Sequence, residues 1–430
     1  MKENLLFSLP SMLYADKEGR IFEHDFYRMA GFYGNSPYPL DESCLVPLPE
    51  FSKLFFLPDC PPVGLNPESG QWETVFTAPF DRGEKECFAV AAFMEPGWVR
   101  VHLPAAVYKA KKYTLPMWAY TAVGCDDNGY IASAFRVEYN HRWDPNNFDD
   151  KKLIRAIKKY RKNIADGALT SHLGTCAVDN HCFAAKNLFL ERWEMPVPVS
   201  VRCNARCLGC ISLQTEKGCK PSHQRISFRP DPSEIITMAL HHIKHAEDPI
   251  ISFGQGCEGE PLTEYELIGE CISSIRKKTS GGTINLNTNG SNPEQIKFLI
   301  DSGLDSIRIS MSSARPDFYN AYHRPISFSF DDVRESVKTA ANSGIYTMLN
   351  YLVFPGVTDC EPEFSALSGL IDHTGLNFIH LKNLCIDPDF YLVSMPGDNS
   401  LPFGMNILAD RIKERFPDLE LGYFNKAIKR

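Results

Sequence analysis

The sequence lacks any apolar run long enough to cross a membrane. Its longer runs, such as "CFAVAAFM", fall far short of the roughly 20 residues that a spanning helix needs. The opening "MKENLLFSLPSMLYADKEG" has neither a long apolar segment nor a small-residue cleavage site, so we expect no secretory signal. These absences predict a cytoplasmic protein, in which the fourteen cysteines are reduced thiols or metal ligands rather than disulfides.

An excess of positive charge is also missing. The formal net charge is −8, which removes the usual indication of a nucleic-acid partner. One basic segment stands out, "KKLIRAIKKYRKN" at 151–163, which predicts a helix with Leu153, Ile154 and Ile157 on its buried edge. A solvated helix face is the ordinary explanation of such a run, and contact with RNA is the alternative that we do not favour.

The composition is that of a folded protein of more than one domain. Of the 430 residues, 43% are apolar and 23% charged, which predicts a sizeable core and no extended disorder. The N-terminal part is rich in proline, glycine and aromatics, and it reads as short strands with a tight turn at Asn128-Gly129. We expect a mostly β domain that helps position the substrate (1–145), a basic helix and linker (146–195), an α/β domain (196–390) and a C-terminal extension with a helix (391–430).

The pattern of predicted secondary structure changes near residue 197. Short apolar strands there alternate with longer amphipathic helices, which is typical of βαβ units around a parallel sheet. The predicted strands are "PVSVRC", "PIISFG", "TINLNT", "SIRISM", "TMLNYLVF" and "NFIHLKNL". Six strands with five helices form either an incomplete α/β barrel or an open doubly wound sheet. In both cases the chemistry belongs at the carboxyl ends of the strands.

Three cysteines follow the first predicted strand. Cys203, Cys207 and Cys210 are separated by three and two residues. Thiolates with this spacing can bind three corners of a [4Fe-4S] cluster and leave the fourth iron open, as a catalytic centre requires. The alternative is a structural zinc site, whose fourth ligand would come from Cys219, Cys182 or His181.

These cysteines, followed by a "GEP" turn after the second strand, resemble the radical S-adenosylmethionine (radical SAM) superfamily over about residues 196–390. The resemblance implies a partial (β/α)6 radical SAM barrel, here with an N-terminal mostly β domain. It also implies an enzyme that binds a [4Fe-4S] cluster and S-adenosylmethionine (SAM). Such an enzyme cleaves SAM reductively to a 5′-deoxyadenosyl radical that abstracts hydrogen from a substrate. An external electron donor such as flavodoxin or ferredoxin would supply the electron.

The same resemblance suggests which residues bind SAM. Gly259, Glu260 and Pro261 match the "GEP" turn, where a carboxylate can accept a hydrogen bond from the ammonium group, and Glu258 competes for that role. The other candidates follow the later strands: Asn287, Asn289, Ser310 and Gly356. Each of them also has an ordinary explanation as a residue of a turn or strand end.

Other thiols are weaker candidates. Cys257 and Cys385 lie at strand ends, where either is a candidate catalytic residue that donates a hydrogen atom or carries an adduct, although an inert core thiol is the simpler explanation. The position of Cys385 resembles the branch that methylates adenine in RNA, but that branch needs a second cysteine shortly before the cluster, which is missing here. An auxiliary iron–sulfur cluster is an expectation with little support, because its candidates, Cys176, Cys182 and Cys219, form no compact motif.

We therefore expect a radical SAM enzyme that acts on a protein side chain or a small metabolite. Two alternatives remain at this point: an RNA-modifying radical SAM enzyme that docks RNA on residues 151–163, and a non-catalytic iron–sulfur electron carrier. Three histidines on the predicted helix "MALHHIKHAE" lack the glutamate of a metalloprotease motif, so we expect them to be packed or solvated.

Overall fold

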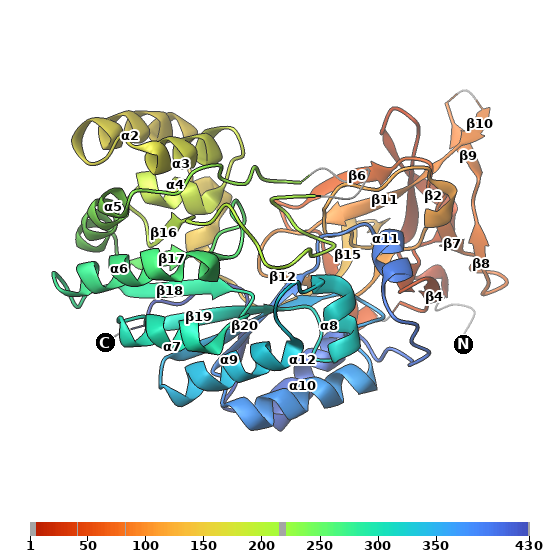
Figure 1. Ribbon diagram of the computed structural model, residues 1–430. Helices are drawn as coiled ribbons and strands as arrows, with labels where there is room; N and C mark the ends of the chain where they lie inside the picture. Colours follow the sequence, from red (N-terminus) through yellow and green to blue (C-terminus); the bar gives the residue numbers. More distant parts are fainter. Residues whose placement is uncertain (1–5, 41, 82, 215–220, 429–430) are drawn as a thin grey trace.

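Short strands build the N-terminal third of the chain, and helices wrapped on a parallel sheet build most of the rest (Figure 1). This computed structural model describes residues 6–40, 42–81, 83–214 and 221–428. No helix among them is long and apolar enough to cross a membrane. The candidate Cys219 lies outside the described residues.

Within the described residues, the largest N-terminal sheet has ten antiparallel strands. They are β1 (Ser11–Ala15), β2 (Ile21–Arg28), β5 (Leu45–Pro47), β6 (Lys53–Leu57), β7 (Val63–Leu65), β8 (Trp72–Thr74), β11 (Phe88–Phe93), β12 (Trp98–Arg100), β14 (Val123–Asp126) and β15 (Gly129–Arg136). Asp126 pairs with Gly129, whose φ is +123°, so the predicted tight turn joins β14 and β15. The prediction of a strand-rich N-terminal region is confirmed.

Two smaller sheets accompany the large one. One consists of β9 (Thr77–Phe80) and β10 (Gly83–Glu86), and the other has the order β13 (Leu103–Pro104), β3 (Gly31–Tyr33), β4 (Ser36–Tyr38).

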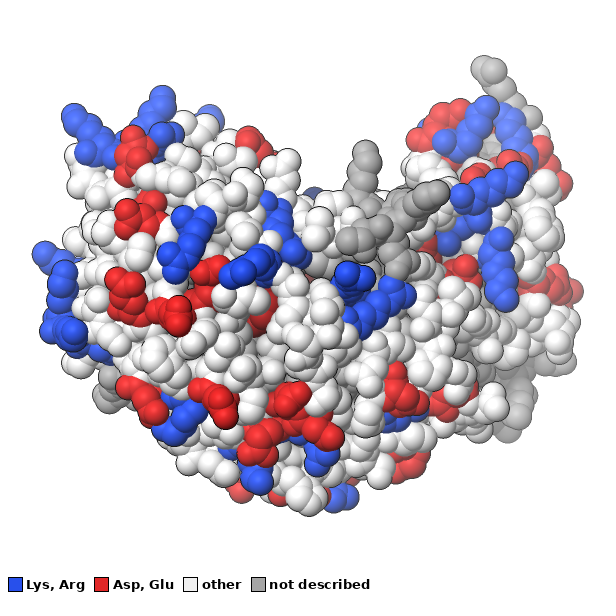
Figure 2. All heavy atoms as spheres, in the orientation of Figure 1, with Lys and Arg blue, Asp and Glu red and all other residues white. Residues whose placement is uncertain are grey.

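Three helices connect the strand-rich region to the parallel sheet: α2 (Asp150–Asn163), α3 (Ala168–Val178) and α4 (Phe183–Phe189). The basic segment forms α2, as predicted, and Leu153 is buried on it. Ile154 is exposed, however, and Tyr160 takes the buried position, because it lies seven residues after Leu153 on the same face. Figure 2 shows Lys and Arg side chains gathered over α2 at the tip of this lobe.

The second sheet is parallel throughout and has seven strands within the described part of the chain. In spatial order they are β16 (Glu194–Val197), β17 (Ile250–Phe253), β18 (Thr283–Thr288), β19 (Ser306–Met311), β20 (Tyr346–Val353), β21 (Phe378–Asn383) and β22 (Glu420–Gly422). The connecting helices include α5 (Pro232–His245), α6 (Tyr265–Arg276), α7 (Pro293–Asp301), α9 (Phe330–Asn342) and α10 (Glu361–Thr374).

The order of these strands decides between the two predicted architectures. A doubly wound sheet reverses its strand order at a switch point, whereas here each strand neighbours the next along the chain. Consecutive helices also contact one another, α5 with α6, α6 with α7, and α7 with α9, so they cover one face. This arrangement is that of a partial α/β barrel, and the predicted fold class is confirmed.

Details of the prediction need correction. The first strand is Glu194–Val197, not residues 198–203, because the backbone N–H groups of Val199 and Ser200 donate to the Glu258 side chain instead of to a neighbouring strand. The strand β22 was not predicted, nor were the helices α8 (Pro316–His323) and α11 (Pro388–Ser394). The expected C-terminal helix is α12 (Met405–Arg415).

After β22, residues 423–428 cross the open side of the barrel. Asn425 Nδ2 donates to Glu194 Oε1 (2.7 Å) at the start of β16, and the Ile428 N–H donates to Thr283 Oγ1 (2.7 Å) at the start of β18. The backbone N–H groups of Tyr423 and Phe424 donate to Glu138, which follows β15. This segment therefore ties the last strand of the sheet to the first strands and to the N-terminal region.

The two halves of the molecule also meet at the carboxyl end of the barrel. Lys111 forms a buried ion pair with Asp387 (2.8 Å), which follows β21. The Gly34 N–H donates to the carbonyl of Pro355 (3.1 Å), and a Cβ added at Gly356 would lie 2.2 Å from the Gly34 nitrogen. Glycine is therefore required at position 356 for this close contact, and its φ of +83° requires glycine as well.

Candidate active site

A cavity of about 480 Å³ lies at the carboxyl ends of the barrel strands. Its walls come from the segments that follow β16 and β17 and from the ends of β18 to β21. Most of the predicted site residues line it: Cys203, Cys207, Cys210, Gly259, Glu260, Pro261, Asn287, Asn289, Ser310 and Cys385. The barrel topology thus brings together residues up to 182 positions apart in the sequence, from Cys203 to Cys385.

The cysteine loop is held from below by α8. The N–H of Leu208 donates to the Tyr322 carbonyl (2.9 Å), and the N–H of Arg206 donates to the His323 carbonyl (3.2 Å). A Cβ at Gly209 would lie 2.5 Å from the Tyr322 hydroxyl, so glycine allows the loop to lie against the tyrosine. These contacts fix the backbone of the loop on both sides of Cys207.

The spacing of the three loop sulfurs distinguishes the two predicted kinds of metal site. In the described part of the chain, these cysteines do not form a group whose sulfurs all lie within 4.8 Å of one another. A tetrahedral zinc ion would hold its thiolates about 3.8 Å apart, whereas thiolates on different irons of a cluster lie farther apart. As they lie, the three sulfurs do not form the compact group that one zinc ion would require.

The surroundings of the three thiols also suit a cluster. Burial raises the pKa of Cys203 to about 11 and raises that of Cys207 as well, so a bound metal is needed to hold both as thiolates. Arg225 Nη2 lies 3.5 Å from the sulfur of Cys210, and His323 Nδ1 lies 3.5 Å from that of Cys207. Both are groups that can donate hydrogen bonds to thiolate sulfur.

The "GEP" turn packs directly on the cysteine loop. The Gly259 N–H donates to the Ser200 carbonyl (2.7 Å), and the Glu260 N–H donates to the Arg202 carbonyl (2.7 Å). A Cβ at Gly259 would lie 1.9 Å from the Arg202 oxygen. Glycine is therefore required at position 259 because the backbone of the cysteine loop lies so close to it. This contact explains the glycine without a bound cofactor.

The two glutamates of the turn have different surroundings. Glu258 accepts hydrogen bonds from the N–H groups of Val199 (2.8 Å), Ser200 (2.9 Å) and Gln255 (2.6 Å), and it does not line the cavity. Glu260 lines the cavity, and its carboxylate accepts from Leu262 N–H (3.1 Å), Asn289 N–H (2.9 Å) and the Thr288 hydroxyl. Burial raises the pKa of Glu260 to about 7 and that of Glu258 to about 8. A cationic ligand at Glu260 would favour its charged form.

The two asparagines of β18 and its following turn make structural contacts at the cavity wall. Asn287 Nδ2 donates to the carbonyl of Gly254 (2.8 Å), which joins β18 to the turn after β17. Asn289 Nδ2 donates to Asn204 Oδ1 (2.7 Å) in the cysteine loop. Both side chains therefore fix strand-end loops relative to one another, and the sequence alone did not predict these contacts.

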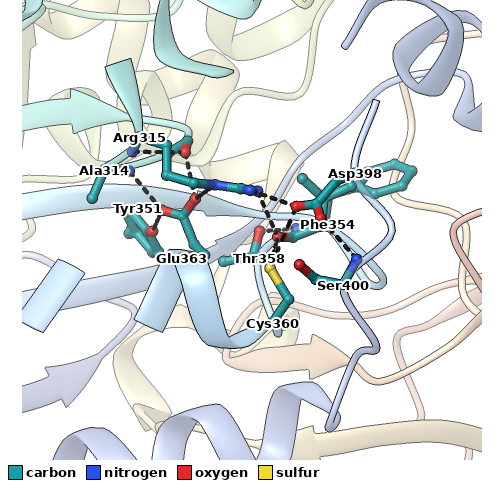
Figure 3. A network of polar contacts seen from close by, with 11 residues as sticks. Ala314, Arg315, Tyr351, Phe354, Thr358, Cys360, Glu363, Asp398 and Ser400 are labelled. Carbon is teal, nitrogen blue, oxygen red and sulfur yellow. Dashed lines mark hydrogen bonds and ion pairs between the residues drawn. The ribbon is translucent and has the colours of Figure 1, made fainter. Parts of the chain in front are cut away.

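The loop after β19 is anchored by a buried polar network (Figure 3). The Glu363 carboxylate on α10 accepts from the Ala314 N–H (2.6 Å), from Arg315 Nε (2.9 Å) and from the Tyr351 hydroxyl. Arg315 also pairs with Asp398 (2.5 Å) in the C-terminal extension. The network holds the loop that follows Ser310, whose hydroxyl lies 3.5 Å from Asn350 Nδ2 inside the cavity.

Two predicted site residues do not line the cavity. Gly356 faces the backbone of Gly34, as described above, because its turn bends toward the strand-rich half. The Cys257 thiol does not line the cavity and lies beside Cys176 and His172 instead, since the turn directs the neighbouring glycines inward. Cys385 does line the cavity, and burial raises its pKa.

Two cations in the cavity were not singled out from the sequence. Arg308 on β19 donates to Asn425 Oδ1 (3.1 Å), and its Nε has no partner among the described residues. Lys382 on β21 lies over the ring of Tyr423, with Nζ 3.2 Å from the ring centroid, and burial lowers its pKa well below the ordinary value. The signal available in the sequence was a single Lys or Arg within a strand that otherwise has no charged residue.

The three histidines of α5 are accounted for by packing. His241 pairs with Glu191 (2.9 Å) and stacks on His245, while His242 is buried, and burial lowers its pKa to about 4. None of them belongs to a metal-ligand group among the described residues.

Residues 197–367 match the family model described as the radical SAM superfamily. The chain carries a radical SAM domain. The predicted family and class of enzyme are thereby confirmed for this segment, which contains the cysteine loop, the "GEP" turn and strands β17 to β20.

The chain is similar to several known proteins. It is 31% identical over 190 residues to a GTP 3′,8-cyclase of Alkaliphilus metalliredigens, covering 44% of this chain and 55% of that one. It is 27% identical over 188 residues to an uncharacterised protein of Methanocaldococcus jannaschii, covering 42% and 56%. The chain thus spans about half the length of these curated relatives. A structure of Streptococcus suis SuiB bound to S-adenosylmethionine matches 73% of this chain and 72% of that one, with 12% identity and a TM-score of 0.38.

Proposed function

We propose that this protein binds a [4Fe-4S] cluster on Cys203, Cys207 and Cys210 and uses SAM to abstract a hydrogen atom from a protein side chain or a small metabolite. One observation carries the proposal: the thiols of Cys203, Cys207 and Cys210 line one cavity together with the "GEP" turn. When bound, the cluster supplies the electron that cleaves SAM to methionine and a 5′-deoxyadenosyl radical. An external electron donor such as flavodoxin or ferredoxin would supply this electron.

The chain's own residues bind and orient the reactants. Glu260 accepts a hydrogen bond from the SAM ammonium group, in addition to the hydrogen bonds that fix its carboxylate to β18. The hydrogen bond between Asn289 and Asn204 fixes the cysteine loop relative to the end of β18, which would keep the cysteines and Glu260 in a constant arrangement. The N-terminal region covers the carboxyl end of β21 and helps to exclude water.

The charges in the cavity favour an anionic substrate group. Arg308 and Lys382 face the cavity without a carboxylate partner among the described residues, and charge-assisted hydrogen bonds to an anion would satisfy them. A carboxylate on a small metabolite or on an acidic side chain suits this pair. The carboxylate that binds Arg308 and Lys382 belongs either to the substrate or to SAM. Measurements of SAM affinity in variants of these residues distinguish the two cases.

The decisive experiment is anaerobic reconstitution with iron and sulfide, followed by reduction with dithionite in the presence of SAM. We expect 5′-deoxyadenosine in the wild-type protein and none in Cys207→Ala. Deuterated candidate substrates then report the reaction through label in 5′-deoxyadenosine. A protein that keeps its cluster but never cleaves SAM would be an electron carrier, and this outcome overturns the proposal.

A further inference from the structure

Three potential metal ligands from two distant segments converge outside the cavity. His172 and Cys176 lie on α3, and Cys257 follows β17. One ligand atom from each, the imidazole nitrogen and the two sulfurs, all lie within 4.8 Å of one another. Among the described residues, no other group of three histidine, cysteine or acidic side chains brings its ligand atoms this close together.

The positions follow from the fold. His172 and Cys176 are four residues apart, so α3 presents both on one face. The turn after β17 directs the Cys257 thiol toward that face, where its sulfur lies within 4.8 Å of both ligand atoms of α3. Cys176 is 2% exposed and Cys257 is 6% exposed, so both sulfurs are shielded from solvent, while His172 is partly exposed.

The distances suit one tetrahedral ion. Zinc binds thiolate at about 2.3 Å and imidazole at about 2.0 Å, which places neighbouring ligand atoms about 3.5 to 3.8 Å apart. His172 Nε2 lies 3.5 Å from the sulfur of Cys176. Ligands on separate irons of a cluster would lie farther apart, so this group fits a single ion and not the auxiliary cluster considered from the sequence.

We propose that His172, Cys176 and Cys257 bind one Zn²⁺ ion that fastens α3 to the "GEP" turn. Cys257 immediately precedes Glu258, Gly259 and Glu260, so the ion holds the turn from the side opposite the cavity. The fourth position is taken by water or by Cys182, whose N–H donates to the Cys176 carbonyl (3.0 Å) in the adjoining turn. The proposal does not depend on the radical chemistry.

Metal analysis of the full-length protein tests this site. We expect about one zinc per chain beside the iron of the reconstituted protein, since three such ligands on a folded protein bind zinc tightly. In a variant with Cys203, Cys207 and Cys210 all changed to Ala, iron should disappear and zinc should remain. Iron at the second site, or zinc lost together with the cluster, contradicts the proposal.

Matched variants assign the ligands. His172→Ala and Cys257→Ser should each lower the zinc content at least severalfold, whereas Cys271→Ser and His241→Ala, a buried thiol and a histidine outside the group, should not. Cobalt substitution gives a second readout: the wild-type protein should show the thiolate charge-transfer and visible bands of a tetrahedral centre. Equal zinc content in all four variants overturns the assignment.

A folding control removes the remaining ambiguity. Circular dichroism identifies any variant that fails to fold, and such a variant is replaced by His172→Gln, which keeps the size and polarity of the side chain. A chelator should lower the melting temperature of the wild-type protein and leave that of Cys257→Ser unchanged. A chelator that has no effect on the wild-type melting temperature and removes no zinc contradicts the site.

Discussion

The guanidinium of Arg100 donates to the carbonyl of Leu384 (2.8 Å), the residue before Cys385. Arg100 ends β12 of the strand-rich half and is completely buried, and Leu384 follows β21 of the barrel. The backbone N–H of Arg100 also donates to Asn383 Oδ1 (3.0 Å), and burial lowers the pKa of its guanidinium to about 10. The N-terminal half is therefore bonded to the cavity wall.

Replacing this arginine should loosen the contact between the halves. Arg100→Met leaves the Leu384 carbonyl buried without its donor, and we expect a loss of about 1–3 kcal/mol in the free energy of unfolding. Urea unfolding followed by fluorescence measures the loss. Arg136→Met is the matched control, since Arg136 is exposed and stacks on Trp98. Equal losses for both variants would argue against a special role for the buried contact.

The cluster ligands can be tested by colour. Cys207→Ala should remove the visible absorption and most of the iron of the reconstituted protein, because the two remaining thiolates are not sufficient to hold the cluster. Cys87→Ser is the control: Cys87 is a buried thiol of the N-terminal half that donates to the Val75 carbonyl (3.3 Å), a bond that serine can keep. Full absorption in Cys207→Ala would sink the assignment of that ligand.

The two glutamates of the "GEP" turn should separate SAM binding from folding. Glu260→Gln removes the charge that faces the cavity, so we expect SAM affinity to fall about tenfold to a hundredfold while the cluster remains. Glu258→Gln should lower stability and change SAM affinity little, because its carboxylate accepts only from backbone N–H groups among the described residues. Isothermal titration with the reconstituted protein decides, and the reverse pattern would exchange the two roles.

The cations of the cavity should act on the substrate and not on SAM. Lys382→Met should leave SAM affinity and uncoupled 5′-deoxyadenosine formation unchanged, and it should lower deuterium transfer from a carboxylate substrate about tenfold or more. The uncharged amide of the same substrate should be poor with the wild-type protein. A drop in SAM affinity would instead assign Lys382 to the SAM carboxylate.

Asp359 should make stability depend on pH. It is fully buried, it accepts from the Gly356 N–H (2.6 Å), and burial raises its pKa from 3.8 to about 7. Between these values the folded state binds more protons than the unfolded state, so the contribution of Asp359 to the free energy of unfolding falls as pH rises from about 4 to about 7. Asp359→Asn should remove this contribution, gaining stability over wild type at pH 8 but little at pH 4. Urea unfolding at both pH values measures the difference in stability between Asp359→Asn and the wild type. The same difference at pH 4 and pH 8 would contradict this prediction.

The sequence was sufficient to predict the position of residues that simply follow a strand in the order of the chain. Short strands that alternate with amphipathic helices predicted a parallel sheet, either an open sheet or a barrel. Their carboxyl ends placed the cysteines, the "GEP" turn and Ser310 at one edge, where the structure has a cavity that these residues line. It was not sufficient where a side chain's direction depends on a turn. Cys257 and Gly356 follow strands just as Glu260 does, yet one faces α3 and the other faces Gly34. Arg308 and Lys382 were missed because a charge inside a strand is recognisable as functional only when the barrel interior is known.

The contacts of residues 423–428 bear on how a reactant reaches the cavity. Glu138 is bonded to this segment, and Arg100 is bonded to the end of β21, so the two halves are braced at two separate places. A molecule braced in this way does not open as a hinge. Access to the cavity then depends on small movements of loops and not on rotation of the two halves, so a slender group on a flexible chain will enter more easily than a rigid folded body.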